Sequence, residues 1–330
     1  MTKIAVTGGS GFIGSHLVDE LIKQNYEVLV IDNLINGRKE NNSEISNHPN
    51  FTFHDADILE FDTMCQLLKG VDIVYHLACL GVRHSIHSPF ENHRVNAEGS
   101  LNVLEASKIN NIKKFFYIST SEIYGDIKSF PIDEQGVPLP KTVYGSSKLA
   151  GENYAYSYYK CYDLDVTITR IFNNYGPRAH YEGDAGEIIP RSIVNILYGK
   201  QPVIFGDGKV TRDFFYVKDT AKALVQLMST PNIKGEIFNI GTGTEISMTE
   251  LQNMLLGLMN KQHELPIEYL ADRPADVPRL WVNANKFNST TGFKAAYTFE
   301  QGLKETIAYY REVFETTNML EKIKLINWEK

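Results

Sequence analysis

Short apolar runs alternate with amphipathic stretches along the first half of the chain. Each run has the composition of a buried strand, and each stretch repeats its apolar residues at helical spacing. The expected strands cover 3–7, 26–31, 51–54, 71–77, 114–118 and 165–170, and the clearest helices cover 15–23, 89–109 and 143–162. Strands that alternate with helices predict the α/β class, with a doubly wound parallel Rossmann sheet whose ligands bind at the carboxyl ends of the strands.

After Arg170 the pattern becomes irregular and rich in turns. Further helices are expected at 189–199, 219–229, 248–260 and 299–314, and short strands at 202–205, 212–217 and 235–239. We therefore expect a main domain at 1–173, to which 219–241 returns, and a smaller, interleaved C-terminal substrate lobe at 174–330. The polar segment 179–184 is either a lid over a ligand or a surface loop.

A glycine-rich turn joins the first strand to the first helix. Gly8, Gly11 and Gly14 are spaced as in dinucleotide-binding βαβ units, where glycines permit a tight turn and bring backbone N–H groups close to a pyrophosphate. The N-terminus of the following helix favours the same negative charge. The second strand ends at Asp32, whose carboxylate can bind ribose hydroxyls and would repel a 2′-phosphate. The turn therefore predicts NAD rather than NADP, and Arg38 is the one nearby residue that argues for NADP.

Polar side chains follow the strand at 114–118, and a polar pair opens the next helix. Thr120 and Glu122 lie at the strand end, and Tyr144 and Lys148 are four residues apart. Residues at this spacing share a helix face, so the Lys148 ammonium is expected beside the Tyr144 phenol. A neighbouring cation favours phenolate and lowers its pKa from about 10. The group predicts a base that deprotonates a bound alcohol, although the Tyr-x-x-x-Lys spacing alone also occurs in ordinary helices.

Composition limits the kind of protein. Hydrophobic residues make up 43% of the 330 and charged residues 22%, while 33 basic against 40 acidic residues give a net charge of −7. These values are typical of a soluble globular protein and lack the basic footprint of a nucleic-acid-binding domain. No apolar run approaches the roughly 18 residues of a membrane span, and the chain opens directly on a strand. We expect a cytoplasmic protein with neither a membrane nor a nucleic-acid partner.

Cysteine and histidine usage predicts neither disulfides nor a metal site. The three cysteines, Cys65, Cys79 and Cys161, are unclustered, which is typical of a reducing compartment. His84 and His87 are three residues apart, but no cysteine or carboxylate cluster completes a set of metal ligands around them. We expect these histidines to lie in a substrate loop or on the surface.

An ordered series of motifs extends over nearly the whole chain. In the first half these are G-G-S-G-F-I-G, Asp32-Asn33, Asp57-Ile58, His76-Leu77-Ala78, Ser119-Thr120-Ser121-Glu122 and Tyr144-x-x-x-Lys148, and in the second Arg170-I-F-N-N-Y-G-P-Arg178, Gly206-D-Gly208, T-Arg212-D-F, Asn239-I-Gly241 and Arg273-P-A-Asp276-V. With these motifs the chain resembles the extended short-chain dehydrogenase/reductases, and within them the nucleotide-sugar epimerase/dehydratase branch.

The resemblance implies NAD as a tightly bound cofactor and a nucleotide-diphosphate sugar as substrate, the nucleotide most simply being UDP. The residues implied to bind NAD are Gly8, Gly11, Phe12, Ile13, Gly14, Asp32, Asn33, Asp57, Ile58, Leu77, Ala78, Tyr144 and Lys148. Those implied to contact the substrate are Arg83, Ser121, Asn173, Arg178, Arg212 and Arg273. The resemblance also implies a homodimer in which the helix at 143–162 takes part.

The same resemblance implies oxidation of a hexose at C4, with Tyr144 as base, Lys148 as its partner and Thr120 as a hydrogen-bond bridge. Glu122 favours a 4,6-dehydratase, because a carboxylate near C5 and C6 suits removal of the C5 proton. A UDP-hexose 4-epimerase and a UDP-glucuronate decarboxylase remain alternatives, and Glu122 would then be a structural acceptor. A sensor that binds NAD without chemistry is the non-enzyme alternative, and the presence of Tyr144, Lys148 and Thr120 argues against it.

Overall fold

A seven-stranded parallel sheet forms the main domain of the computed structural model, which describes residues 1–273 and 276–329. Positions 274 and 275, inside the Arg273–Asp276 motif, and position 330 lie outside the described residues. The strands, in spatial order, are β11 (Ile237–Ile240), β6 (Val166–Ile171), β5 (Lys114–Thr120), β4 (Ile73–His76), β1 (Lys3–Thr7), β2 (Glu27–Ile31) and β3 (Phe51–His54). All neighbouring pairs are parallel, which confirms the predicted fold class.

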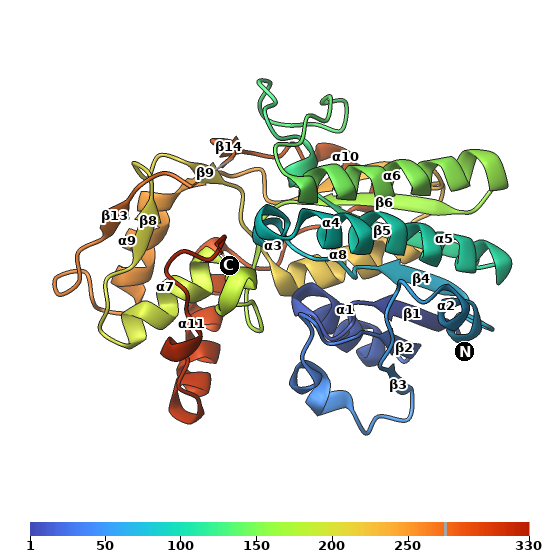
Figure 1. Cartoon of the computed structure of the whole chain (residues 1–330), viewed down its shortest axis with the longest axis horizontal. Coiled ribbons are helices and arrows are strands. Elements are labelled where there is room, and N and C mark those ends of the chain that lie inside the picture. Colours follow the sequence, from blue (N-terminus) through green and yellow to red (C-terminus); the bar gives the residue numbers. More distant parts are fainter. Residues whose placement is uncertain (274–275, 330) are drawn as a thin grey trace.

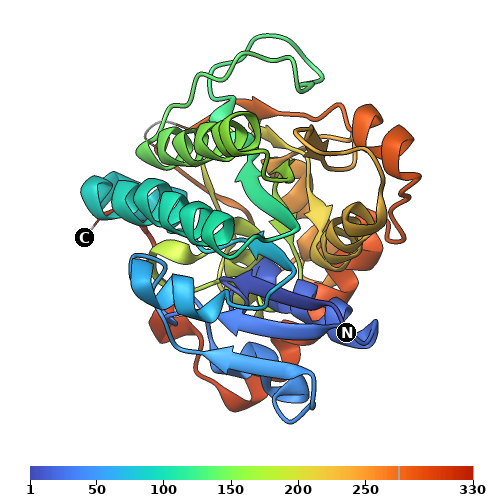
Figure 2. The same cartoon turned by 90° about the vertical axis from the view of Figure 1, so that its right-hand side faces the viewer.

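Helices cover both faces of this sheet, as Figures 1 and 2 show. The helices on one face are α1 (Phe12–Lys23), α8 (Val217–Ser229) and α10 (Asn285–Thr291), and those on the other are α2 (Phe61–Leu67), α5 (Gly99–Ile109) and α6 (Val143–Tyr162). Each face has its own apolar core, in which Leu17 and Leu224 pack on one side and Leu104 and Tyr158 on the other. Because both faces are buried, the strands are nearly continuous apolar runs, and polar side chains gather at their ends.

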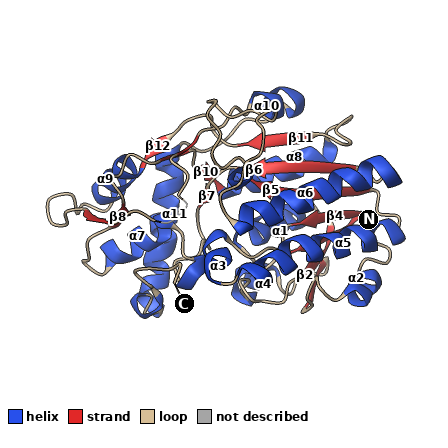
Figure 3. Ribbon diagram, turned by 45° about the horizontal axis from the view of Figure 1, so that its top comes forward, coloured by secondary structure: helices blue, strands red, loops and turns tan. Residues whose placement is uncertain are grey.

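The smaller lobe lies beyond the carboxyl ends of the strands (Figure 3). Its helices are α7 (Ile188–Leu197), α9 (Met248–Leu258) and α11 (Phe299–Thr316), and its strand pairs are β7 (Asn174–Tyr175) with β10 (Phe215–Tyr216), β8 (Val203–Phe205) with β13 (Glu268–Leu270), and β9 (Thr211–Arg212) with β12 (Ile246–Ser247) and β14 (Arg279–Leu280). Between lobe elements the chain returns to the main domain for α8 and β11, and again for α10. Lobe and domain are therefore interleaved.

The strand predicted at 212–217 is wrong, because the chain divides there into β9 and β10, which belong to different sheets. Asp213 lies at the break, fully buried, and its carboxylate accepts the N–H groups of Thr242 and Gly243 at 2.8 Å each. These bonds connect the break between β9 and β10 to the loop that follows β11. Burial also raises the pKa of Asp213 to about 6.

The helix predicted at 89–109 is continuous but not uniform. It begins as α4 (Pro89–His93), widens into a π turn at Arg94–Glu98 and continues as α5. Asn96 in the π turn is fully buried, and its side chain accepts the Leu80 N–H at 2.8 Å and donates to the Leu80 carbonyl at 2.9 Å. The turn thereby fixes the loop after β4. The short helices α2 and α3 (Val82–His87) were not predicted.

The described residues contain no helix that is long and apolar enough to cross a membrane. The same part of the chain contains no group of three His, Cys, Asp or Glu residues placed to hold a metal ion. All three cysteines are free thiols.

Candidate active site

One cavity of about 460 Å³ lies between the carboxyl ends of the main strands and the lobe. It brings together residues that follow β1, β2, β4, β5 and β6 with residues of the lobe. The sequence-predicted residues that line it are Gly8, Gly11, Phe12, Ile13, Gly14, Asp32, Asn33, Ile58, Leu77, Ala78, Arg83, Thr120, Ser121, Glu122, Tyr144, Lys148, Asn173, Arg212 and Arg273. Asp57 and Arg178 do not line the cavity.

The glycine turn between β1 and α1 packs so closely that side chains would not fit. Gly8 has a φ of +72°, and a Cβ there would lie 2.8 Å from the Ala78 nitrogen. A Cβ on Gly14 would lie 2.1 Å from the Gly8 carbonyl oxygen. Among the residues that the structure describes, no side chain caps the N-terminus of α1, so its first N–H groups are left for a ligand at the turn. Free N–H groups and a helix dipole at a narrow, open turn fit the pyrophosphate of a dinucleotide.

Asp32 is held at the end of β2 by backbone groups on both sides. Its carboxylate accepts the N–H of Ser10 and the N–H of Leu34, each at 2.9 Å, and burial raises its pKa. It faces the cavity beside Asn33, which fits the expected contact with an adenosine ribose. Asp57, outside the cavity, accepts the Asn33 amide at 3.0 Å and therefore orients a lining residue.

Arg38, the residue that argued for NADP, does not line the cavity. Its guanidinium pairs with Glu182 of the lobe and lies 5.7 Å from the centroid of the Tyr181 ring. A guanidinium held in this way is directed to the lobe and away from Asp32. The residues present therefore fit NAD better than NADP.

Tyr144 stands in the first turn of α6, where the Thr142 hydroxyl accepts the Gly145 N–H at 3.1 Å and caps the helix. Burial raises the pKa of the Tyr144 phenol well above 10, and the neighbouring Cys79 acts in the same direction. A hydrogen bond with Thr120 opposes this rise. The expected lowering of this pKa is wrong, because the cost of burying a phenolate outweighs the hydrogen bond with Thr120.

The Lys148 side chain is almost fully buried one helical turn after Tyr144. Its ammonium lies 4.5 Å from the centroid of the Tyr117 ring, and the Tyr117 hydroxyl donates to the Lys148 carbonyl at 3.1 Å. Burial by itself would lower the pKa of Lys148, but Tyr117, Cys79 and Glu152 outweigh it and the pKa lies above its usual value. Lys148 therefore places a positive charge in the lining of the cavity.

A buried polar network lies directly beneath the strand end that carries Thr120. Glu152 of α6 accepts the Ser119 hydroxyl at 2.8 Å and the Nε of Arg170 at 2.9 Å. Arg170 continues the network to the Tyr124 hydroxyl at 2.8 Å, which in turn donates to the Asn239 side chain of β11 at 2.8 Å. The network connects the helix of Tyr144 and Lys148 to β5, β6 and β11. Residue spacing gave no sign of it.

Two arginines of the lobe share one carboxylate at the substrate end of the cavity. Arg212 and Arg273 each donate to Asp276 Oδ1, at 2.7 and 2.9 Å. Burial lowers the pKa of Arg212, and Arg273 adds to this, while Asp276 and Glu122 oppose it. The pKa of Glu122 is raised by burial, although both arginines act against the rise. The cavity thus places a carboxyl group of raised pKa next to a pair of guanidinium groups that can bind phosphate.

Asn173 is the clearest sign that this part of the cavity is built for a ligand. Its side-chain oxygen is buried and finds no hydrogen-bond partner among the described residues. A buried acceptor without a partner costs about 1–3 kcal/mol. A hydroxyl or amide donor of a ligand would remove that cost.

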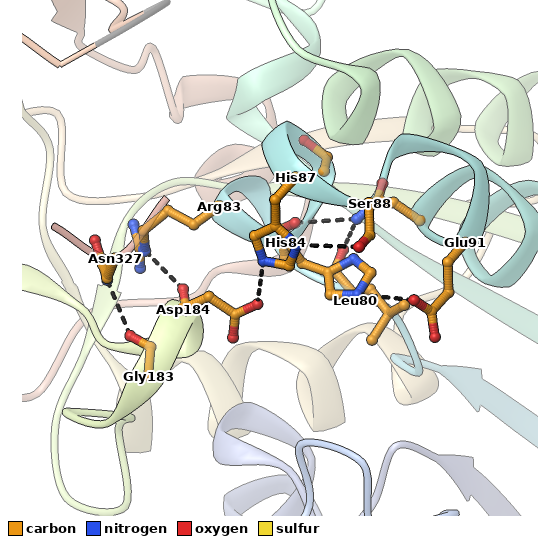
Figure 4. A network of polar contacts seen from close by, with 12 residues as sticks. Leu80, Arg83, His84, His87, Ser88, Glu91, Gly183, Asp184 and Asn327 are labelled. Atoms are coloured by element: carbon orange, nitrogen blue, oxygen red, sulfur yellow. Dashed lines mark hydrogen bonds and ion pairs between the residues drawn. The ribbon is translucent and has the colours of Figure 1, made fainter. Parts of the chain in front are cut away.

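Arg83 lines the cavity and is bound to the lobe through its Nε and Nη2. Nε donates to the Asp184 carbonyl at 2.8 Å (Figure 4), and Nη2 donates to the Ala185 carbonyl at 3.4 Å and to the Glu187 carboxylate at 2.7 Å. His87, on the same helix α3, contacts the Asp184 carboxylate at 2.8 Å. In this structure Arg83 therefore holds the segment 184–187 of the lobe. Of the segment 179–184, His180 and Asp184 line the cavity, and the two alternatives expected for that segment, a lid and a surface loop, stay predictions.

The structure does not bring Arg178 to the substrate residues. Its guanidinium donates to Asp19 of α1 at 2.7 Å, so it joins lobe and main domain outside the cavity. Reasoning from the sequence also missed residues that the structure makes important, namely Tyr117 beneath Lys148 and Glu152 in the buried network. Asp276 stood within a recognised motif, three residues after Arg273, and this spacing could have suggested the ion pair.

Comparisons with known proteins agree with this geometry. The sequence model of the GDP-mannose 4,6 dehydratase family matches residues 5–306. A putative UDP-glucose 4-epimerase from Methanocaldococcus jannaschii is 37% identical over 315 residues, which are 93% of this chain and 98% of the relative. UDP-glucuronic acid decarboxylase 1 from Xenopus tropicalis is 33% identical and covers 94% of this chain and 73% of its own length.

The fold is also similar to solved structures. The crystal structure of a dTDP-glucose 4,6-dehydratase from Streptomyces venezuelae, with NAD bound, has a TM-score of 0.90 at 30% identity. The similarity covers 97% of this chain and 100% of that one. These relatives catalyse different reactions on related substrates.

Proposed function

Since the chain belongs to the extended short-chain dehydrogenase/reductases, and within them to the NAD-dependent nucleotide-sugar epimerases and dehydratases, we propose that it oxidises a nucleotide-activated hexose at C4. The observation that carries the proposal is that one cavity is lined by the glycine turn, by Tyr144 and by the arginine pair. Cofactor, sugar and diphosphate would bind at these three parts of its lining. UDP is the nucleotide to test first.

Different residues of the cavity would bind the cofactor, bind the substrate and remove the proton. The turn at Gly8–Gly14 would hold the pyrophosphate of NAD and Asp32 its adenosine ribose, while Arg212 and Arg273 would bind the substrate diphosphate. When bound, NAD supplies the hydride acceptor and, in its oxidised form, a positive charge. Tyr144 takes the proton of the sugar hydroxyl, with Thr120 as hydrogen-bond bridge. Because burial disfavours the phenolate, Lys148 must be charged for Tyr144 to act as a base.

For the step after oxidation we propose 4,6-dehydration, with Glu122 as the group that removes the C5 proton. Oxidation at C4 makes that proton acidic. The C6 hydroxyl then leaves as water with the proton taken up by Glu122, and addition of the hydride at C6 and of a solvent proton at C5 gives a 4-keto-6-deoxy sugar. The supporting observation is that Glu122 lines the cavity with a raised pKa, which makes its carboxylate a stronger base. Interactions with Arg212 and Arg273 keep the ionised form accessible.

A UDP-hexose 4-epimerase is the second candidate, favoured by the 37% identity to the archaeal putative epimerase. It would return hydride to the opposite face of C4, and Glu122 would only accept hydrogen bonds. A UDP-glucuronate decarboxylase is the third candidate, since a relative of that activity is 33% identical.

One NMR experiment separates the three reactions. The purified protein is incubated in deuterated water with UDP-glucose, UDP-N-acetylglucosamine, UDP-glucuronate or GDP-mannose. A new C6 methyl with deuterium at C5 establishes dehydration, and inversion at C4 without deuterium refutes it in favour of epimerisation. Loss of carbon dioxide from UDP-glucuronate establishes decarboxylation. Glu122→Gln should abolish dehydration while hydride transfer at C4, followed as NADH absorbance, continues.

The homodimer implied by the resemblance stays a prediction. Sedimentation of the purified chain would test it, since a dimer has twice the 37.4 kDa mass of the chain.

A further inference from the structure

The last described residues of the chain pack against the lobe. Trp328 is 8% exposed, and its ring lies edge-on to that of Phe205, with the centroids 4.7 Å apart and the planes at 76°. Asn327 is 1% exposed, whereas the preceding aliphatic residues Leu325 and Ile326 are 52% and 41% exposed. The segment therefore turns an amide and an indole inward and leaves its aliphatic side chains outside, which simple apolar burial would not favour.

Asn327 contacts the segment 183–186, of which 184–186 line the cavity. Asn327 donates from Nδ2 to the carbonyls of Gly183 and Gly186, at 3.2 and 3.1 Å, and Arg83 donates to the two carbonyls between them. Figure 4 shows the contacts to Gly183 and Asp184. The four consecutive carbonyls of 183–186 thus all accept hydrogen bonds from side chains. Arg83 of the main domain donates to two of them, and Asn327 donates to the other two. Arg191 of α7 holds the segment 325–328 as well, because it donates to the Leu325 carbonyl at 2.9 Å.

Phe205 gives Trp328 a direct connection to the cavity. Phe205 lies at the end of β8 and is part of the cavity lining, together with Ile204 and Ser192. Figures 1 and 3 show β8 at the end of the lobe away from the main sheet. Phe205 pairs with Leu270 of β13, and Arg273 follows Leu270 by three residues, so the cavity lining continues from the arginine pair to Phe205. If a diphosphate binds at the arginines, the group that reaches Phe205 is the nucleobase.

We propose that Asn327 and Trp328 are positioning residues for the nucleotide, which they serve by holding Phe205 and the segment 183–186 in place as the far end of the cavity. The inference rests on the proposed function, because it takes a nucleoside diphosphate as the ligand. An edge-on aromatic pair contributes about 0.5–1.5 kcal/mol, which corresponds to about a twofold to tenfold change in a dissociation constant. Neither Asn327 nor Trp328 lines the cavity, so we expect them to affect binding of the nucleotide and not the chemical step.

Calorimetric titration of the full chain with UDP, dTDP and GDP tests the proposal, and the tightest of the three becomes the probe. Trp328→Ala should weaken binding of the probe by about twofold to tenfold, with a matching rise in KM and unchanged kcat and NAD affinity. Trp328→Phe should recover most of the affinity. Leu325→Ala is the matched control in the same segment, because that side chain points outward, and it should bind like the parent protein.

A second measurement keeps the proposal testable if Trp328→Ala folds poorly. The chain has two tryptophans, so Trp281→Phe leaves Trp328 as the only indole, and its emission should change when the probe saturates. Any one of three results would overturn the inference and leave the proposed function standing. Trp328→Ala binds the probe as tightly as the parent protein, or Leu325→Ala loses as much affinity as Trp328→Ala, or the Trp328 emission does not change when the probe saturates the protein. If none of the three diphosphates binds the parent protein, the proposed function is wrong and the inference fails with it.

Discussion

Neutralising Glu152 should destabilise the whole protein, because it leaves the Arg170 guanidinium buried without its counter-charge. The two side chains are 3% and 5% exposed, respectively, and lie on α6 and β6. Glu152→Gln keeps the shape of the side chain and its bond to the Ser119 hydroxyl, but removes the negative charge that faces Arg170. The substitution therefore tests the charge and not the packing.

The expected size follows from burial and chain length. Removing one partner of a buried ion pair costs about 3–5 kcal/mol. An unfolding entropy of about 2.1 cal/mol/K per residue gives about 0.7 kcal/mol/K for the 330 residues. The melting temperature of Glu152→Gln should consequently fall by about 4–7 °C.

Differential scanning calorimetry at pH 7 measures this shift. Glu300→Gln is the matched control, since Glu300 forms an exposed ion pair with Lys304 on α11. Such a pair contributes about 0.5 kcal/mol to stability, so its loss should lower the melting temperature by less than about 1 °C. The double variant Glu152→Gln/Arg170→Met removes both charges and should recover part of the loss. A melting temperature for Glu152→Gln no lower than that of Glu300→Gln would refute the reasoning.

Three further outcomes are expected. Tyr144→Phe should lower turnover by about 10²–10⁴-fold with NAD and nucleotide affinity kept, and full activity would contradict the proposed base. Burial lowers the pKa of His16 to about 3 in the fold, so the unfolded chain takes up the proton first, and stability should fall by about 2 kcal/mol per such histidine from pH 7 to pH 5. In urea titrations His16→Gln should lose that component, and an unchanged pH slope would exclude it. Gly14→Ala should lower the affinity for NAD in a binding titration, because the added Cβ clashes with the Gly8 carbonyl. Gly257→Ala is the control in α9, where the Cβ meets open space, and in urea titrations it should be neutral or stabilising by about 0.5–1 kcal/mol.

Local patterns were sufficient for the main sheet and for most of the candidate site. Buried parallel strands are recognisable because their apolar runs are short and regularly interrupted by helices. Once a parallel sheet is expected, residues that follow different strands must meet at one edge. The strand order therefore predicts that Gly8, Asp32 and Thr120 lie in one cavity, as they do in the structure.

The lobe was less predictable, since its strands are only two or three residues long and owe their pairing to distant partners. The predicted strand at 212–217 illustrates this, because bonds from Asp213 to residues 242 and 243 decide where it breaks. No periodicity at 212–217 contains that information.

The amino-acid sequence by itself thus determined the fold class, the cofactor turn and the types of chemical group in the site, because these depend on short-range spacing and on the geometry of parallel strands. Only the tertiary structure decided the state of those groups. It showed that burial raises the pKa of Tyr144, that Arg83 holds a lobe segment 101 to 104 residues away, and that Arg178 pairs with Asp19 outside the cavity. Desolvation and long-range pairing arise from packing, and packing brings together residues whose separation along the chain leaves no local pattern.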